Sequence, residues 1–175
     1  TVDVGWSDGA DIALRLNGLW RNSDGYRDDK ENSTLAVNPT LRWRADDSIT
    51  VDLSFEYAEL EYMSDSGLPL VNGELPSSVA RETSYQSPFA RSDQTTVRAR
   101  LDRTVDLSDS VTLRNKAYFT ELDGLSAGTL FTHTAPTEAG SWEAGRVLTS
   151  LDDEQRAVGN QLELAAQFDT GSLSH

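Results

Sequence analysis

Apolar and polar residues alternate along much of the chain, and the alternation is cleanest between Ile49 and Tyr57. In that segment every second residue is apolar, and the residues between them are Thr, Asp, Ser and Glu. Residues two apart lie on the same face of a β-strand, whereas a helix would scatter them around its circumference. The segment is therefore predicted to be a strand with one apolar and one polar face.

The same period of two recurs in six other segments, which brings the predicted number of strands to seven. The six are residues 2–6, 12–20, 35–43, 97–101, 111–119 and 158–168. No segment has a convincing helical period. The predicted fold class is all-β.

The connections between these strands are of two lengths. Residues 7–10, 45–48 and 106–110 form short turns rich in Asp and Ser, whereas residues 21–33, 63–94 and 121–155 form long loops. Short turns at one end and long loops at the other are typical of outer-membrane β-barrels. We therefore predict an antiparallel up-and-down meander with neighbouring strands paired in sequence order, an open segment of a transmembrane β-barrel.

Aromatic residues on the apolar face gather toward both ends of the predicted strands. Such girdles flank the lipid-facing band of a membrane barrel, while a soluble sheet that packs on a core does not require them. The residues toward the short turns are Trp6, Trp43 and Phe168, and those toward the long loops are Trp20, Tyr57 and Phe119.

The opposite face is polar and partly basic. We expect its basic side chains to pair with acidic ones on neighbouring strands, and its surplus positive charge to line a passage or to meet an acidic plug. Its basic residues are Arg15, Arg42, Arg44, Arg98, Arg100, Arg114 and Lys116, mixed with Asp52, Glu56, Asp102 and Glu163. Two residues fit the pattern poorly. Asn115 falls on the apolar face, and Pro39, which has no N–H to donate, implies a β-bulge.

Charge and composition exclude several classes of protein. The chain has 29 acidic and 15 basic residues and a net charge of −14, which argues against a nucleic-acid partner. It contains no cysteine, so disulfides, cysteine-based zinc sites and thiol nucleophiles are excluded. The mean hydropathy is −0.49, and no apolar run is long enough for a membrane helix.

Five stretches resemble the barrel of the TonB-dependent receptors, most closely the ferric-siderophore receptors. They are the stretches 11–28 (DIALRLNGLWRNSDGYRD), 38–44 (NPTLRWR), 67–76 (GLPLVNGELP), 111–120 (VTLRNKAYFT) and 168–175 (FDTGSLSH). The resemblance implies a Gram-negative outer-membrane protein. It also implies a barrel of 22 strands around a plug, which imports ferric-siderophore complexes with energy from the TonB complex.

Compared with a complete receptor of this family, residues 1–175 are expected to form a single partial β-barrel region without a plug domain. Seven strands do not close a barrel, because bacterial single-chain barrels start at eight. The implied partners are a ferric siderophore, the protein's own plug and remaining strands, the TonB complex and outer-membrane lipid.

The resemblance also implies where ligand would be recognised. Aromatic and cationic side chains of the outer loops would hold the chelate, and the candidate residues are Tyr62, Arg81, Tyr85, Phe89, Arg91 and Trp142. The siderophore would carry the iron, so no resident cofactor, protein metal site or enzymatic activity is expected.

Two other classes of function stay open from the sequence. One is a structural or adhesive outer-membrane β-barrel, which shares the girdles and loops but not the resembling stretches. The other is a soluble all-β enzyme or carbohydrate-binding module, for which a pair of carboxylates would carry glycoside hydrolysis. The sequence singles out no such pair.

Overall fold

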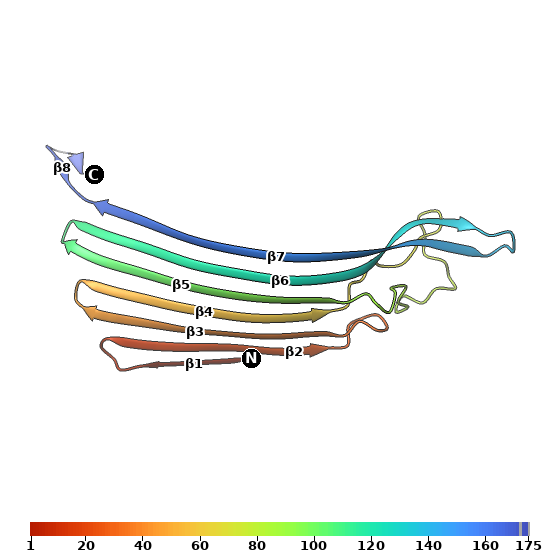
Figure 1. Cartoon of the computed structure of the whole chain (residues 1–175), viewed down its shortest axis with the longest axis horizontal. Coiled ribbons are helices and arrows are strands. Elements are labelled where there is room, and N and C mark those ends of the chain that lie inside the picture. The colour runs from red at the N-terminus through yellow and green to blue at the C-terminus, as the bar shows by residue number, and fades with distance from the viewer. Residues whose placement is uncertain (172, 175) are drawn as a thin grey trace.

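A computed structural model describes residues 1–171 and 173–174, so the predictions that involve Ser172 and His175 lie outside the described residues. Seven strands form one antiparallel sheet in the order of the sequence, β1-β2-β3-β4-β5-β6-β7, which confirms the predicted meander (Figure 1). Their bounds are β1 (Val2–Ser7), β2 (Ile12–Ser23), β3 (Asn32–Asp46), β4 (Ile49–Tyr62), β5 (Ser92–Ser108), β6 (Val111–Pro136) and β7 (Trp142–Ala166). A separate hairpin pairs β8 (Asp169–Thr170) with β9 (Leu173–Ser174).

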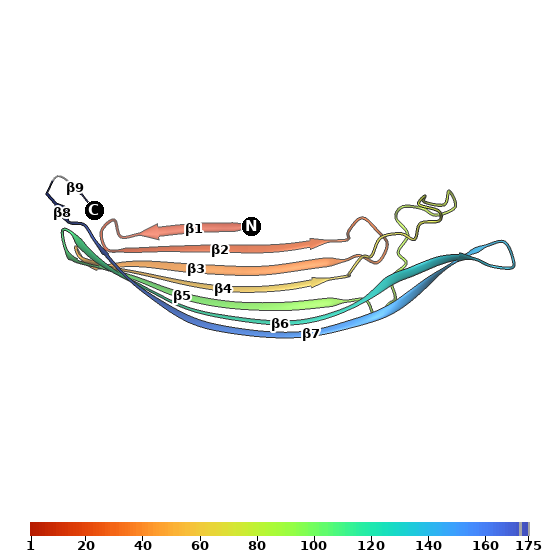
Figure 2. The same cartoon turned by 90° about the horizontal axis from the view of Figure 1, so that it is seen from above.

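The sheet is a single curved layer, and among the described residues no second layer covers either face (Figure 2). Ala90 is the only buried apolar residue in the described part of the chain. Large apolar side chains such as Leu14, Leu53 and Leu164 are 46%, 44% and 63% exposed. A soluble sandwich would instead stack two such faces on each other.

The pairing register keeps the two faces apart across all seven strands. Leu14 lies opposite Leu41, Leu41 opposite Leu53, and Leu53 opposite Leu101. Because side chains alternate along a strand, a shift by one residue would turn a whole apolar set to the other face. The predicted apolar and polar faces are both confirmed.

Pro39 does not cause the β-bulge that the sequence implied. The register between β3 and β4 is the same on both sides of it, and the irregularity lies instead between Arg44 and Asp46. Pro39 leaves the Phe55 carbonyl without a ladder partner, and the Asn38 side-chain amide donates to that carbonyl at 2.8 Å. A side chain thus replaces the missing backbone donor within a central strand.

The prediction of a third long loop at residues 121–155 is wrong. Residues 121–136 continue β6 and residues 142–155 belong to β7, so only residues 137–141 connect the two strands. Beyond the pair Ser92↔Ser126, where β5 begins, this hairpin continues as a two-stranded ribbon of residues 127–150, called here the extension (Figures 1 and 2). The other long connections are confirmed in shorter form, as a first loop of residues 24–31 and a long loop of residues 63–91.

Candidate outer-loop site and polar wall

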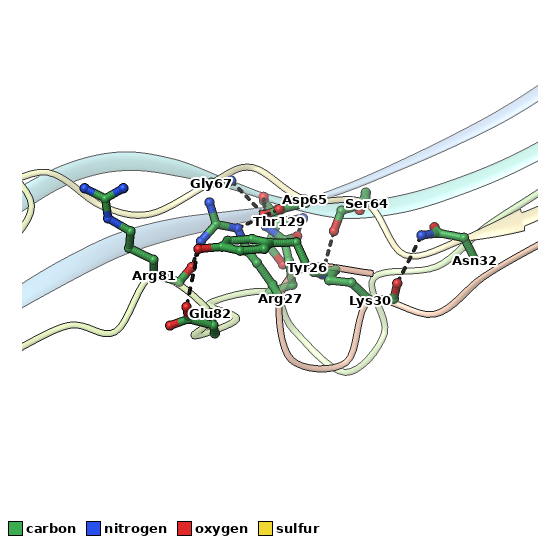
Figure 3. Close-up of polar contacts among 11 residues, drawn as sticks. Tyr26, Arg27, Lys30, Asn32, Ser64, Asp65, Gly67, Arg81, Glu82 and Thr129 are labelled. Atoms are coloured by element: carbon green, nitrogen blue, oxygen red, sulfur yellow. Dashed lines mark hydrogen bonds and ion pairs between the residues drawn. The ribbon is translucent and has the colours of Figure 1, made fainter. Parts of the chain in front are cut away.

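The first loop and the long loop are tied together through Arg27 (Figure 3). Its Nε atom lies 2.7 Å from Asp65 Oδ2, and its Nη1 atom donates to the Arg81 carbonyl. The neighbouring Tyr26 hydroxyl donates to Glu82 at 3.3 Å. One guanidinium therefore joins both limbs of the long loop to the first loop.

Lys30 fixes the base of the same assembly. Its residue is 4% exposed, and its Nζ atom donates to the Ser64 carbonyl at 2.7 Å. Burial lowers the pKa of the Lys30 ammonium, and the nearby Asp65 carboxylate works in the opposite direction. The turn that brings Lys30 inward needs Gly25, because a Cβ there would overlap the Lys30 backbone and the φ angle is 77°.

The long loop also covers the backbone edge of the extension. The Gln86 side chain accepts from the Thr129 N–H at 3.1 Å and donates to the Thr129 carbonyl at 3.2 Å, as a neighbouring strand would. The Ser87 N–H donates to Thr129 Oγ1 at 3.0 Å, and Ser66 donates to the Thr129 carbonyl. Thr129 is fully buried by these contacts. An edge that β5 leaves unpaired is thereby protected.

Two of the predicted ligand-binding residues, Tyr62 and Arg91, line one cleft at the base of the loops. The cleft has a volume of about 500 Å³ and includes acidic residues such as Glu61. Arg91 lies 3.0 Å from Asp93 and 3.2 Å from Glu61, and these carboxylates raise its pKa. Its charge is already compensated within the chain.

The other four predicted residues lie apart from that cleft. Tyr85 packs edge-on against Phe131 with 6.3 Å between ring centroids, so its ring anchors the long loop to the extension. Phe89 is 40% exposed and Arg81 is also exposed. Trp142 begins β7 at the tip of the extension and is 47% exposed. The six residues thus occupy several places on the loop assembly, and their role in binding stays a prediction.

The polar face carries the predicted cross-strand ion pairs. Arg42 holds Asp52 with two hydrogen bonds of 2.7 and 3.0 Å, and Asp102 is bound by Arg100 on the same strand. The remaining pairs on this face are Arg15 with Asp3 (2.6 Å), Arg98 with Glu56 (2.7 Å) and Arg114 with Glu163 (2.9 Å). The wall is therefore charged but largely self-neutralising.

Sequence reasoning missed the residues that hold the loops together, namely Arg27, Lys30, Gln86 and Thr129. Thr129 fell within the predicted third loop. A usable signal was present, because residues 129–134 (TLFTHT) are rich in β-forming residue types. The described residues include no helix able to cross a membrane. They also include no group of three or more His, Asp or Glu residues arranged to hold a metal ion.

One open antiparallel sheet with an apolar face, a charged face, short turns at one end and long loops at the other defines a segment of a membrane-type β-barrel wall. No protein-family model matches the sequence. The chain is 25% identical over its whole length to the catecholate siderophore receptor Fiu of Escherichia coli K12. It is also 25% identical to PiuA of Acinetobacter baumannii, described as a probable TonB-dependent siderophore receptor. The chain spans about a quarter of the length of these relatives.

Solved structures agree in fold. The ferric-catecholate import receptor Fiu in its open form superposes with a TM-score of 0.86 at 22% identity, covering 98% of this chain and 29% of that one. The siderophore receptor PiuA superposes with a TM-score of 0.77 at 20% identity, covering 98% and 26%. The resemblance to the TonB-dependent receptors is confirmed, and the fold of the chain is that of a segment of such a receptor barrel.

Proposed function

We propose that this chain forms part of the barrel wall and outer mouth of an outer-membrane receptor that imports ferric-siderophore complexes. The observation that carries the proposal is the end-to-end similarity to two receptors named for siderophores, one of them for ferric catecholates. The relatives are named as receptors rather than as enzymes.

The two faces of the sheet support a membrane location. A row of apolar side chains this exposed is stable only against lipid or another apolar surface, because water penalises it. In the proposed barrel the apolar face meets lipid, and the face of ion pairs lines the lumen. The short turns then lie on the periplasmic side, and the loop assembly lies outside the cell.

The loop assembly supports capture of an anionic chelate. Arg81 and Phe89 on the long loop offer an exposed cation and an exposed ring. Aromatic stacking and charge-assisted hydrogen bonds are the interactions that hold an anionic, ring-bearing ligand. Iron enters as cargo inside the siderophore, so the protein itself needs no iron ligands.

Import also requires partners that complete the pore. The remaining barrel strands would pair with β1 and β7, and a plug domain would fill the lumen and connect to the TonB complex. The polar face suits a plug that docks through hydrogen bonds, because its arginines are oriented by carboxylates yet stay exposed to solvent.

The test changes the exposed cation and the exposed ring of the long loop in the intact receptor. The double variant Arg81→Ala, Phe89→Ala removes both side chains, and it keeps the Arg27–Asp65 pair and the Gln86–Thr129 contacts. We expect binding of a ferric catecholate to weaken by at least tenfold while surface expression and barrel assembly stay normal. A control with Ser77→Ala and Ser78→Ala on the same loop keeps the cation and the ring and should bind normally. Unchanged binding and uptake in the Arg81→Ala, Phe89→Ala variant would remove these two residues from the site.

A further inference from the structure

Three polar residues interrupt the apolar face on β5, β6 and β7. They are Arg103, Asn115 and Asn160. Arg103 lies directly opposite Val51 on one side and Asn115 on the other. Arg103 is exposed, and its side chain has no hydrogen-bond or ion-pair partner among the described residues. The guanidinium therefore stands on a face that is otherwise built for contact with lipid.

The two asparagines form a preorganised pair beside it. Asn115 Nδ2 donates to Asn160 Oδ1 at 2.9 Å and to the Gln161 carbonyl at 3.1 Å, and Asn160 Nδ2 donates to Asn115 Oδ1 at 3.4 Å. Both donors of the Asn115 amide are used. Within the described part of the chain Asn160 keeps one free side-chain N–H, because its amide has two and only one is engaged. This explains why Asn115, a misfit in the sequence pattern, is tolerated on the apolar face.

An apolar groove crosses the strands from β2 to β7, one step farther from the short turns than Arg103 and Asn115. Its volume is about 820 Å³, and Asn160 is among its lining residues. Ala99 lies opposite Phe119, and Ala117 lies opposite Leu101, so small side chains form a floor between large ones. A groove lined this way on an exposed apolar face fits hydrocarbon rather than a hydrated ligand.

We propose that this site holds one glycerophospholipid, with its phosphate on Arg103 and the free N–H of Asn160 and an acyl chain in the groove. A guanidinium binds a phosphate with two parallel hydrogen bonds, and such a partner offsets the cost of placing Arg next to hydrocarbon. The inference rests on the proposed membrane barrel for the location of the lipid.

The position of Arg103 along β5 selects the leaflet. Only Val105 and Leu107 continue the apolar face between Arg103 and the turn at residues 109–110, and Trp43 of the short-turn girdle lies in the same row as Arg103. The groove lies on the side of Arg103 that faces away from this turn, toward the middle of the apolar band. Phosphate near the short turns and chain toward the middle is the orientation of a lipid in the periplasmic leaflet.

Native mass spectrometry of the intact receptor, purified in mild detergent, tests the site. Added phosphatidylglycerol should bind as one retained adduct, and Arg103→Gln should reduce the occupancy of that adduct at least fivefold. Arg44→Gln on the polar face is the matched control and should leave it unchanged. Ala117→Phe fills the groove and should also reduce retention, although it keeps the charge. Inorganic phosphate alone should not compete, because it offers no acyl chain.

The outcomes separate this proposal from the proposed function. Equal phosphatidylglycerol retention in wild type and Arg103→Gln overturns the lipid site, and so does a receptor dimer that dissociates on Arg103→Gln with no lipid lost. Ferric-catecholate binding is measured on the same samples. Normal chelate binding with equal lipid retention rejects the lipid site alone, whereas Arg103-dependent retention without chelate binding rejects the proposed transport function alone.

Discussion

Placing an arginine at Leu53 tests which face of the sheet meets lipid. Leu53 is the central one of five apolar positions along β4, from Ile49 to Tyr57, and its cross-strand neighbours are Leu41 and Leu101. It therefore lies near the middle of the apolar band. An arginine on the lipid face near the bilayer midplane costs roughly 2 to 4 kcal/mol. Because every 1.4 kcal/mol is tenfold, Leu53→Arg should shift the folding equilibrium by roughly 30- to 700-fold.

Denaturant titration of the intact receptor in lipid vesicles measures this shift. Ser54→Arg is the matched control, because Ser54 is the next residue and lies on the polar face between Thr40 and Arg100. There the new charge meets water, and repulsion from Arg100 costs about 1 kcal/mol or less. Equal free energies of unfolding for the two variants would refute the assignment of faces. A larger loss for Ser54→Arg would reverse it.

Three further predictions concern local contacts. Gln86→Ala should leave the Thr129 N–H and carbonyl buried without these side-chain partners, at a local cost of about 1–3 kcal/mol. Faster hydrogen exchange at the Thr129 amide would show this loss. Gly159→Ala should destabilise the barrel by about 1 kcal/mol, because its Cβ would overlap the outer end of the Tyr118 ring, which is 49% exposed and has to move aside. The double variant with Tyr118→Ala should recover most of this loss in denaturant titration. Hydrogen bonds from backbone N–H groups, of which that of Ile12 has the largest effect, lower the pKa of Asp8 below its ordinary value of 3.8. The Asp8 carboxylate should therefore stabilise the β1–β2 turn fully above pH 3.8, and this stabilisation should be lost as the pH falls through the lowered pKa. Turn-amide exchange that has the same pH dependence in Asp8→Asn would contradict this.

The strands were predictable wherever one face had to be apolar. Along β4 the requirement for an apolar face imposes strict alternation, and the residues from Ile49 to Tyr57 follow it without exception. Farther along β6 and β7 that requirement ends. Asp123 and Glu154 lie opposite each other on the continuation of the apolar face, so polarity there resembles that of a loop. This part of β6 and β7, together with the extension, is held by backbone hydrogen bonds between the two strands, and such bonds leave no pattern in the hydropathy of the sequence.

The loop assembly was not predictable for a different reason. Its contacts join residues far apart in sequence, such as Arg27 with Asp65 and Lys30 with Ser64, and no local pattern marks either pair. The candidate aromatics were chosen by residue type, which does not distinguish a ring exposed for ligand from one that anchors a loop. Tyr85 belongs to the second kind, because its ring packs on Phe131.

The polar nature of the loop assembly bears on how it would bind a chelate. Three segments meet at the long-loop end of the sheet, and they are joined mainly by hydrogen bonds and ion pairs, with Lys30 and Thr129 buried between them. A ligand that meets loops already fixed in this way does not have to supply the free energy for ordering them. Affinity for the chelate should therefore fall when an anchor such as Arg27 is removed, although that side chain is engaged with Asp65 rather than with ligand. Arg27→Met in the intact receptor should weaken ferric-catecholate binding mainly through slower association, because fewer loop conformations are competent to bind. An unchanged association rate would mean that the loops order themselves without this anchor.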